Sequence, residues 1–242
     1  MVMHTCAYGG MRNTVKYIWR CSIKLIKPRR ILFARHAQTD WNDSSRYQGR
    51  TDVPLNGGGR RQAESLARRL ASWRADRVLS STLVRARETA EIVMEKMPDP
   101  PALELSEDLI ELDFGEWEGM SVSEVRQRYG ELYERWRDDP ASVDPPKGEP
   151  FDDVIRRVNR AMSPILSSDA ERVLVICHGG TIRAAVVSLL GAPSSIAWRI
   201  RIDNCALFAV DILAGRCSLA FANDALHLFA GNVRAEQIPL LP

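Results

Sequence analysis

Short apolar runs alternate with segments of helical periodicity along most of the chain. A continuous apolar run at residues 31–34 predicts a buried strand, and residues 77–80 predict a second one. The strongest strand signal lies at residues 173–177, which lead directly into Gly179 and Gly180. Uninterrupted apolar runs of this kind are typical of parallel strands that are covered on both faces.

Four segments carry apolar residues at the three- and four-residue spacing of a helix face. The first begins after Asn56, a residue that can cap a helix, and continues to about Trp73. Three more helices are predicted farther along the chain, at residues 86–97, 154–166 and 182–190. The proline-rich stretch at residues 138–150 predicts a loop before the third of these four helices.

Strands that alternate with helices predict an α/β fold, here a single three-layer α/β/α domain with a mainly parallel central sheet. We place this domain at residues 31–230, with a basic N-terminal extension at residues 1–30 and a C-terminal tail at residues 231–242. A chain of 242 residues that is 45% hydrophobic is long enough for one such core. Because no apolar run approaches the roughly 20 residues that cross a bilayer, no integral membrane segment is expected.

Charge and cysteine content narrow the partners and the compartment. Residues 1–30 carry seven Lys and Arg and no Asp or Glu, so the rest of the chain is net acidic although the whole carries +2. A net acidic domain makes nucleic acid an unexpected partner. The basic segment is read as an extension outside the core, with a targeting or membrane-surface role as the alternative. Five scattered cysteines without CxxC spacing predict neither a disulfide framework nor zinc, and favour a cytoplasmic location.

Two of the four histidines follow predicted strands directly. His36 comes after the strand at residues 31–34, behind Arg35, and His178 comes after the strand at residues 173–177. Ligands in such folds collect beyond the carboxyl ends of the parallel strands. The two histidines and Arg35 are therefore predicted to share one site.

The residues around His36 carry a resemblance to a known family. Residues 35–42, Arg-His-Ala-Gln-Thr-Asp-Trp-Asn, resemble the Arg-His-Gly-Glu-Thr-x-Trp-Asn signature of the histidine phosphatase (phosphoglycerate-mutase-like) superfamily. Ala37 and Gln38 depart from the usual Gly-Glu, but neither position supplies a catalytic group. Further similar motifs follow in family order at residues 46–55, 80–90, 111–119, 178–180 and 223–228. The last of them resembles the broad-specificity or α-ribazole phosphatase branch.

The chemistry expected of these residues is phosphoryl transfer. A phosphate monoester is a dianion that repels charged nucleophiles, whereas neutral imidazole can attack it and form a phosphohistidine, here on His36. Arg35 and Arg85 are expected to hold the phosphate oxygens as always-charged forks, and His178 to donate another hydrogen bond. A helix beginning after the glycine pair would direct backbone N–H groups at the same anion.

The resemblance supplies the remaining site residues. It implies that Glu111 protonates the leaving oxygen and then activates water, with Glu116 or Glu118 as alternative acids. It also implies that Asn42 and Gln48 are neutral donors, and that Thr39 and Gly179 belong to the phosphate- or substrate-binding set. His, Asp, Glu and Cys show no metal-ligand spacing, so neither a metal nor another cofactor is expected.

Two simpler readings apply to neighbouring residues. Arg87 is expected to pair with Glu91 on the helix surface rather than to bind phosphate. Cys177 is expected to face the core rather than to act as a nucleophile, because no Cys-x5-Arg phosphatase loop follows it.

The expected function is a metal-independent phosphomonoesterase that acts on a small phosphorylated metabolite. The alternative is a mutase-type isomerase, which is disfavoured because the interval between Glu111 and His178 is short, acidic and broken by prolines. Side chains that read the leaving group are expected at residues 46–50 and 118–150, in particular Arg126, Arg128, Tyr129, Tyr133, Trp136 and Arg137. Residues 148–150, Gly-Glu-Pro, depart from the usual Gly-Glu-Ser, so the substrate stays open, as does a homodimer.

Overall fold

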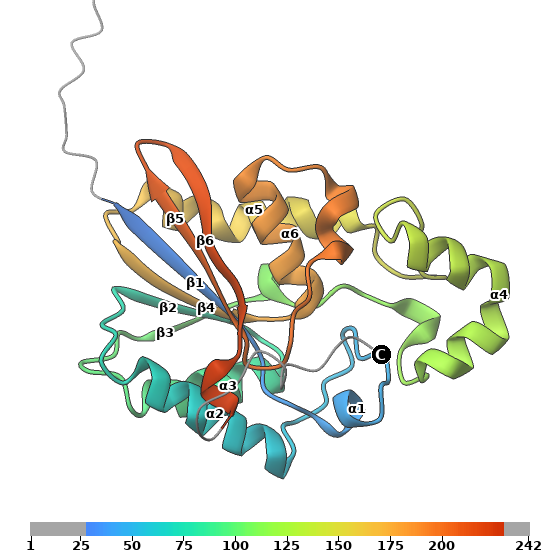
Figure 1. Cartoon of the computed structure of the whole chain (residues 1–242), viewed down its shortest axis with the longest axis horizontal. Coiled ribbons are helices and arrows are strands. Elements are labelled where there is room, and N and C mark those ends of the chain that lie inside the picture. The colour runs from blue at the N-terminus through green and yellow to red at the C-terminus, as the bar shows by residue number, and fades with distance from the viewer. Residues whose placement is uncertain (1–27, 230–242) are drawn as a thin grey trace, which may run out of the picture.

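The computed structural model describes residues 28–229, which form three layers around one six-stranded sheet (Figure 1). The strands are β1 (Arg29–Arg35), β2 (Arg77–Ser81), β3 (Leu103–Ser106), β4 (Arg172–Cys177), β5 (Leu207–Leu213) and β6 (Arg216–Asp224). Their order across the sheet is β3-β2-β4-β1-β5-β6. The first four of these pair in parallel, and β5 pairs antiparallel with both β1 and β6. The predicted α/β fold with a mainly parallel sheet is confirmed.

Two helices cover each face of the sheet: α2 (Gly57–Leu70) and α3 (Val84–Met94) on one side, α5 (Phe151–Ser167) and α6 (Gly179–Leu190) on the other (Figure 1). Strand β1 shows how the sequence produces this arrangement. Ile31 and Phe33 belong to the core under α5 and α6, whereas Leu32 and Ala34 belong to the core under α2 and α3. Because side chains alternate along a strand, an uninterrupted apolar run fills both cores at once.

The predicted elements lie where expected, with shifts at several ends. Strand β1 begins at Arg29, two residues before the predicted start, because the Arg29 guanidinium donates to backbone carbonyls after α5 and Arg30 pairs with Asp211. Helix α2 is capped by Asn56 as predicted, through a 2.7 Å bond from the Gly59 N–H.

Two helices, α2 and α3, end before the predicted residue, and three helices, α3, α5 and α6, begin two or three residues earlier than predicted. Helix α2 ends at Leu70 instead of near Trp73, whose N–H bonds to the Leu70 carbonyl three residues back. Helix α3 ends at Met94, because Lys96 and Met97 also bond three residues back and tighten the chain into a turn. Helix α6 begins at Gly179, three residues before the predicted start.

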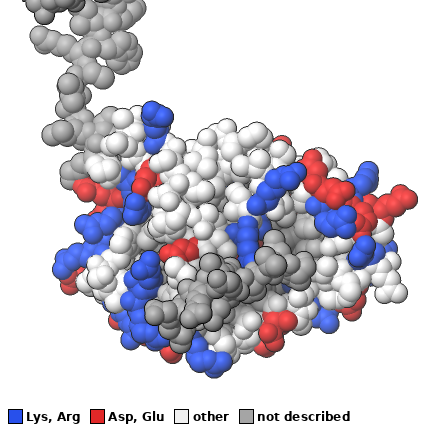
Figure 2. Space-filling model, in the orientation of Figure 1, with Lys and Arg blue, Asp and Glu red and all other residues white. Residues whose placement is uncertain are grey.

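Helix α4 (Val122–Asp138), which the sequence pattern did not predict, lies outside the three layers (Figure 1). It begins with a capping box formed by Ser121 and Glu124 and is kinked at Gly130, where φ is +42°. Its inner face joins a small core of Trp117, Val125, Tyr133 and Trp136. Figure 2 shows acidic and basic side chains mixed over its outer end.

Short helices complete the connections: α1 (Asp40–Asp43), η1 (Glu107–Leu109), η2 (Gly115–Trp117), η3 (Ser194–Arg199) and η4 (Leu226–Leu228). Within residues 28–229, no helix is long and apolar enough to cross a membrane. The predicted C-terminal tail and residues 1–27 of the predicted N-terminal extension lie outside the described residues.

Candidate active site

The register of two neighbouring strands brings the two strand-end histidines together. β1 and β4 pair in parallel with Arg35 opposite Cys177, the last residue of each strand. His36 and His178, which directly follow the two strands, are therefore neighbours. Their ring centroids lie 5.1 Å apart, and the backbone N–H of His36 donates to the backbone carbonyl of Cys177 at 2.9 Å. Both side chains are buried. The sheet itself therefore fixes this pair.

A pocket of about 250 Å³ opens beside His36. Seven of the predicted site residues line it: Arg35, His36, Asn42, Gln48, Arg85, Glu111 and Gly179. The other two predicted residues, Thr39 and His178, are fully buried and do not line it.

The hydrogen bonds of His36 determine which ring nitrogen is free to react. Burial, followed by the charges of Arg85 and Arg35, holds the His36 pKa well below its ordinary value, so the ring is neutral at pH 7. Nδ1 lies 2.7 Å from the Ala37 carbonyl, which can only accept, so the single ring proton is on Nδ1. Nε2 is left with its lone pair, as a nucleophile requires.

His178 Nε2 lies 2.8 Å from the Ser81 hydroxyl, and either atom can donate. Burial, with the Arg85 charge next in size, keeps the His178 pKa well below its ordinary value, so the ring is neutral at pH 7. The Ser81 hydroxyl also accepts from the Leu83 N–H, and when it donates to Nε2 the ring proton is on Nδ1. Nδ1 is buried and has no partner among the described residues. Ser81 was not singled out from the sequence.

Arg35 and Arg85 are both held by backbone carbonyls, and neither forms an ion pair with a carboxylate of residues 28–229. Arg35 Nη1 donates to Ile202 O, while Arg85 donates to Thr51 O and Gly49 O at 2.8 and 2.7 Å. The Nε atoms of both arginines are buried without a partner. Burial lowers the pKa of Arg85 to about 10, which leaves it charged at pH 7. Two charged forks therefore face the pocket with donors to spare.

Gly49 must be a glycine for Arg85 to be held this way. Its φ is +52°, and a Cβ at this position would lie only 1.8 Å from the Glu118 carboxylate. That carboxylate accepts hydrogen bonds from Arg50 N, Thr51 N and Thr51 Oγ1. Glu118 thus shapes the loop whose carbonyls orient Arg85.

Glu111 is almost fully buried at the pocket wall. Its Oε1 accepts from Leu112 N at 2.8 Å and from Gly180 N at 3.0 Å. The helix was predicted to begin after the glycine pair and to direct backbone N–H groups at the anion, but α6 begins at Gly179 and the Gly180 N–H donates to this carboxylate. A Cβ on Gly180 would lie 2.6 Å from the same oxygen, so the close approach depends on the second glycine of the pair.

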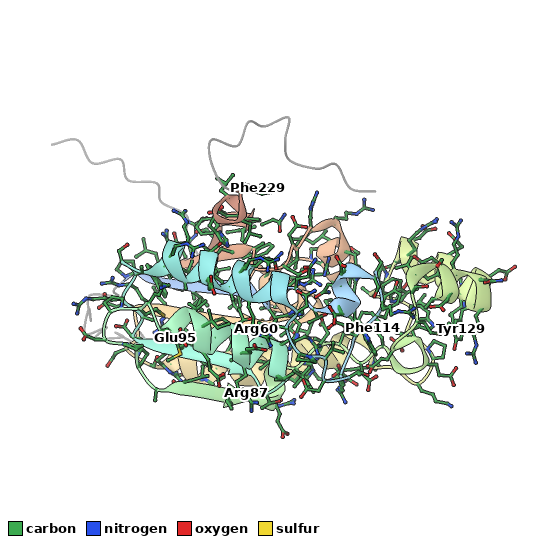
Figure 3. All side chains as sticks on the ribbon, turned by 90° about the horizontal axis from the view of Figure 1, so that it is seen from below. Arg60, Arg87, Glu95, Phe114, Tyr129 and Phe229 are labelled. Carbon is green, nitrogen blue, oxygen red and sulfur yellow. The ribbon has the colours of Figure 1, made fainter. Side chains whose placement is uncertain are left out.

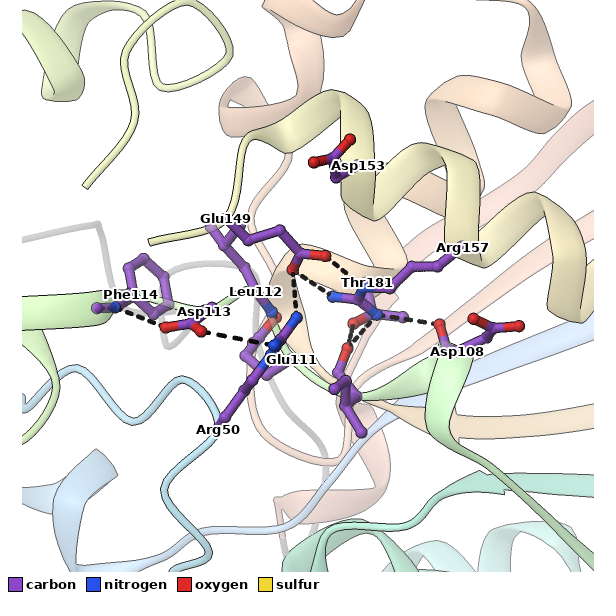
Figure 4. Close-up of polar contacts among 12 residues, drawn as sticks. Arg50, Asp108, Glu111, Leu112, Asp113, Phe114, Glu149, Asp153, Arg157 and Thr181 are labelled. Atoms are coloured by element: carbon purple, nitrogen blue, oxygen red, sulfur yellow. Dashed lines mark hydrogen bonds and ion pairs between the residues drawn. The ribbon is translucent and has the colours of Figure 1, made fainter. Parts of the chain in front are cut away.

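A buried polar network holds the segment that carries Glu111 (Figure 4). Arg157, 5% exposed, donates to the carbonyls of Asp108 and Ile110 and forms a two-bond ion pair with Glu149 at 2.9 and 3.0 Å. Thr181 Oγ1 adds a 2.7 Å bond to the Ile110 carbonyl. These residues tie the Glu111 segment to α5 and α6.

Arg50 extends the same network toward the loop after α1. Its guanidinium bridges Glu149 at 3.3 Å and Asp113 at 3.5 Å (Figure 4). The Glu111 segment is thus linked on its other side to the loop that orients Arg85.

Thr39 supports the site from behind. Its hydroxyl accepts from Asn42 N, and its own N–H donates to Asn42 Oδ1, which together cap α1. Asn204 Nδ2 donates to the same Oδ1 at 3.2 Å and to the His36 carbonyl at 3.0 Å. Asn42 is thus the member of the pair that reaches the pocket, and Asn204 was not anticipated.

The alternatives weighed for the acid and for the nucleophile lie away from the pocket. Glu116 pairs with Lys147, whose hydrogen bond lowers its pKa, and Glu118 is occupied by the loop described above. Cys177 is buried in the core, and burial raises the pKa of its thiol. Arg87 faces the surface beside Glu91, as predicted (Figure 3).

Aromatic side chains line the opposite end of the pocket. Tyr47, Phe114, Trp136 and Trp198 line it, and Trp136 meets Phe114 and Trp198 edge-on at centroid distances of 6.1 and 6.0 Å. Arg46 and Arg183 also line this pocket. Figure 3 shows Phe114 between the three layers and α4, and Tyr129 on α4 itself.

Most of the side chains expected from residues 118–150 to read the leaving group do not reach the pocket; only Trp136 does. Arg126 and Arg137 both pair with Glu134 on the outer surface of α4. Tyr133 is buried against Trp117. The sequence pointed to the right segment, residues 118–150. Because it did not predict helix α4, it could not show which of these side chains face the pocket.

No cluster of three or more His, Cys, Asp or Glu side chains suited to a metal ion occurs in the part of the chain that the structure describes. The groups that converge on the pocket are instead arginines, neutral imidazoles and one carboxylate. The arginines can bind an anion, and the carboxylate can donate a proton to one of its oxygens or accept one from it.

Comparison with known proteins agrees with this geometry. The profile of the histidine phosphatase superfamily (branch 1) matches residues 31–225. An adenosylcobalamin/alpha-ribazole phosphatase of Salmonella typhimurium is 32% identical over 196 residues, 81% of this chain and 96% of the relative. A bifunctional protein of Mycobacterium tuberculosis is 36% identical over 206 residues, 83% of this chain, which spans only 55% of that longer relative. The structure of a mycobacterial glucosyl-3-phosphoglycerate phosphatase with VO3 has a TM-score of 0.74 at 27% identity, covering 81% of this chain and 99% of that one.

Proposed function

The chain belongs to the histidine phosphatase superfamily (branch 1), and from this premise we propose that it hydrolyses the phosphate monoester of a small metabolite through a phosphohistidine on His36. One observation carries the proposal: His36 is neutral, its proton is held on Nδ1 by the Ala37 carbonyl, and its Nε2 lone pair is free. The relatives whose names state a substrate act on small phosphorylated metabolites, which supports the substrate class.

In the first step, His36 Nε2 attacks phosphorus and the bond between phosphorus and the ester oxygen breaks. Arg35 and Arg85 stabilise the charge on the equatorial oxygens through donors that the protein leaves unused. We assign the Nδ1–H of His178 as a further neutral donor, with the Ser81 hydroxyl donating to Nε2 at 2.8 Å so that the ring proton is on Nδ1. Protonated Glu111 gives its proton to the departing oxygen, which leaves as an alcohol.

In the second step, water attacks the phosphohistidine. Glu111, now a carboxylate, takes a proton from this water, the bond between phosphorus and Nε2 breaks, and inorganic phosphate is released. His36 returns to its neutral state with the proton still on Nδ1. Asn42 and Gln48 are assigned as neutral donors to the phosphate, Gly179 as the residue whose small size leaves room for it, and Thr39 as the support of Asn42.

Hydrolysis is favoured over a mutase reaction by the surroundings of the leaving group. A mutase must retain its substrate while the phosphoryl group moves between two hydroxyls. Arg126 and Arg137 of α4, which were expected to read the leaving group, pair with Glu134 on the outer surface, and the helix contributes only Trp136 to the pocket. Water therefore competes well as the acceptor.

We assign the catalytic unit to the domain at residues 31–230, together with Arg29 and Arg30 of β1. We further propose that it works in a reducing, cytoplasmic environment. Cys177, Cys205 and Cys217 are free thiols within the described ranges, which supports this assignment.

The test is a phosphate-release screen over metabolite monoesters in EDTA, run beside an assay for interconversion of 3- and 2-phosphoglycerate. We expect metal-independent phosphate release that vanishes in His36→Ala, and no mutase activity of comparable rate. Restoration of a lost activity by Mg²⁺ or Zn²⁺ would refute the mechanism. Efficient mutase turnover would replace hydrolysis by the isomerase alternative.

A further inference from the structure

A third arginine lines the pocket beside the two that are assigned to the phosphate. Arg183, one turn into α6, donates through Nη2 to the Ile200 carbonyl at 3.1 Å. Its Nε is buried without a partner, as are the Nε atoms of Arg35 and Arg85. No carboxylate among residues 28–229 lies within ion-pair distance of Arg183.

A buried guanidinium that has no salt-bridge partner among the described residues requires a physical explanation. Burial, followed by the charge of Arg35, lowers the pKa of Arg183 to about 10 against the opposing effect of Glu111, so Arg183 stays protonated at neutral pH. A charge of this kind is costly in the empty pocket and is compensated when an anion binds. Arg35 and Arg85 already provide for the phosphate, so Arg183 is one cation more than the reacting group requires.

The position of Arg183 shows which part of a ligand it meets. A methyl group placed on Gly179 would lie 3.1 Å from Arg183 Nη1, 3.8 Å from Glu111 Oε2 and 4.0 Å from Arg35 Nε. Arg183 therefore borders the same small space as the proposed acid. On its other side the guanidinium lies 5.6 Å from the centre of the Trp198 ring, at the aromatic end of the pocket.

The charge on the remaining pocket arginine is already compensated. Arg46 Nη1 donates to Glu124 at 3.0 Å and to the Gly119 carbonyl at 2.6 Å. Beyond the phosphate, the pocket thus offers one arginine that has no carboxylate of the described residues within ion-pair distance. One positive charge matches a monoanion, which for a small metabolite at neutral pH is a carboxylate rather than a second phosphate.

We propose that Arg183 binds a carboxylate of the leaving group, a few bonds from the ester oxygen, and that the substrates are phosphate esters of hydroxy acids. This inference rests on the proposed function, because it is Glu111, as donor to the ester oxygen, that fixes where the leaving group begins. The aromatic wall of Trp198 and Trp136 then contacts the rest of the leaving group.

The test compares esters that differ only in the carboxylate. O-phosphoserine is paired with phosphoethanolamine, and 3-phosphoglycerate with glycerol 3-phosphate. For the wild type, Arg183→Gln and Arg183→Lys, kcat/KM is measured for each ester, together with its inhibition constant against p-nitrophenyl phosphate. Arg87→Gln, a surface arginine on α3, serves as the matched control.

The wild type should prefer the carboxylate member of each pair. Arg183→Gln should reduce that preference by about 10- to 100-fold, the range expected for one charge-assisted hydrogen bond, while Arg183→Lys keeps part of it. A structural role in holding the Ile200 carbonyl would lower both members equally and leave the ratio unchanged. Arg87→Gln should not alter the ratio.

The two proposals fail in different ways. If the wild type hydrolyses p-nitrophenyl phosphate but shows no carboxylate preference, in turnover or in inhibition, the Arg183 assignment is wrong and the phosphatase stands. The same holds if Arg183→Gln changes both members of each pair equally. If the wild type hydrolyses no ester at all, the proposed function itself is wrong and the Arg183 assignment falls with it.

Discussion

The two ends of the pocket are built on different parts of the fold. At the reaction end, the side chains come from β1 and the residue after it, from the start of α3, from the segment after η1 and from the residue before α6. Most of them are anchored to backbone atoms, and His178 is anchored to the Ser81 hydroxyl. At the leaving-group end, aromatic rings come from the loop after α1, from the residue before η2, from α4 and from η3, and they contact one another.

This difference separates chemistry from specificity. Parallel strands in fixed register place His36 and His178 side by side, so the reaction end depends on the sheet itself. The leaving-group end depends on segments outside the three layers, which can vary without disturbing the sheet. Changes at the reaction end should therefore affect every ester, whereas changes at the other end should affect the choice among esters.

Glu111→Gln is expected to have the largest effect on hydrolysis rate, and the size of this effect should depend on how good the leaving group of the ester is. Hydrolysis of an alkyl phosphate should slow by about 10²–10⁴-fold, because a poor leaving group needs the proton. p-Nitrophenyl phosphate should slow far less, since its phenolate departs without help. Glu116→Gln and Glu118→Gln should leave the ratio of the two rates unchanged. If one of these controls shows the leaving-group dependence and Glu111→Gln does not, the acid has to be reassigned.

Arg157→Met tests the support of the Glu111 segment. Removing Arg157 leaves Glu149 with only the more exposed Arg50 as a partner and should lower the free energy of unfolding by up to about 3–5 kcal/mol. Arg126→Met on the outer face of α4 is the matched control and should cost less than about 1 kcal/mol. Denaturant titration of both variants decides the matter. Equal losses would mean that the buried pair does not stabilise the segment as described.

Arg85→Ala should lower kcat by about 10²–10³-fold, the usual cost of one preorganised transition-state donor. The loss should be similar for every ester, because Arg85 contacts the phosphate and not the leaving group. Arg85→Lys should recover little, since an ammonium cannot match the forked geometry. Steady-state rates over the four esters named above check this. A loss confined to one ester would move Arg85 to the leaving-group end.

The lowered pKa values of His36 and His178 predict a smaller effect of pH. The acid limb of kcat/KM, corrected for ionisation of the ester, should lie well below pH 6.5, because His36 stays neutral there. The free energy of unfolding should also depend on pH. As pH falls below about 6.5, the unfolded chain binds protons that the folded chain does not, so the free energy of unfolding declines. His36→Gln/His178→Gln should show a shallower decline, and an acid limb centred at pH 6.5 would contradict the shifts.

The sequence predicted the reaction end far better than the other end. Buried strands have strong apolar runs, and a histidine directly after each of two such strands could be placed at one edge by topology alone. The motif resemblance added Arg85 and Glu111, both of which line the pocket. The supporting groups Ser81 and Asn204 were missed because nothing local marks a partner that is distant in sequence.

The leaving-group end was predicted only in outline, for two physical reasons. Helix α4 was missed although Ser121 and Glu124 form a capping box, because its apolar residues are few and Gly130 interrupts it. Away from the pocket, strands β3, β5 and β6 were also missed, although the two-residue turn at Ala214 and Gly215 marks the β5–β6 hairpin. Arg183 and Trp198 reach the pocket only through tertiary packing, which periodicity does not reveal.

The central claim is that His36 carries the phosphoryl group during turnover. The most direct measurement mixes the enzyme with a labelled ester, quenches in base within the first turnover, and locates the label by mass spectrometry. The account predicts a base-stable, acid-labile phosphoryl group on His36, which is absent in His36→Ala and accumulates in Glu111→Gln with p-nitrophenyl phosphate. Normal turnover by His36→Ala, or label found on another residue of the active wild type, would contradict it.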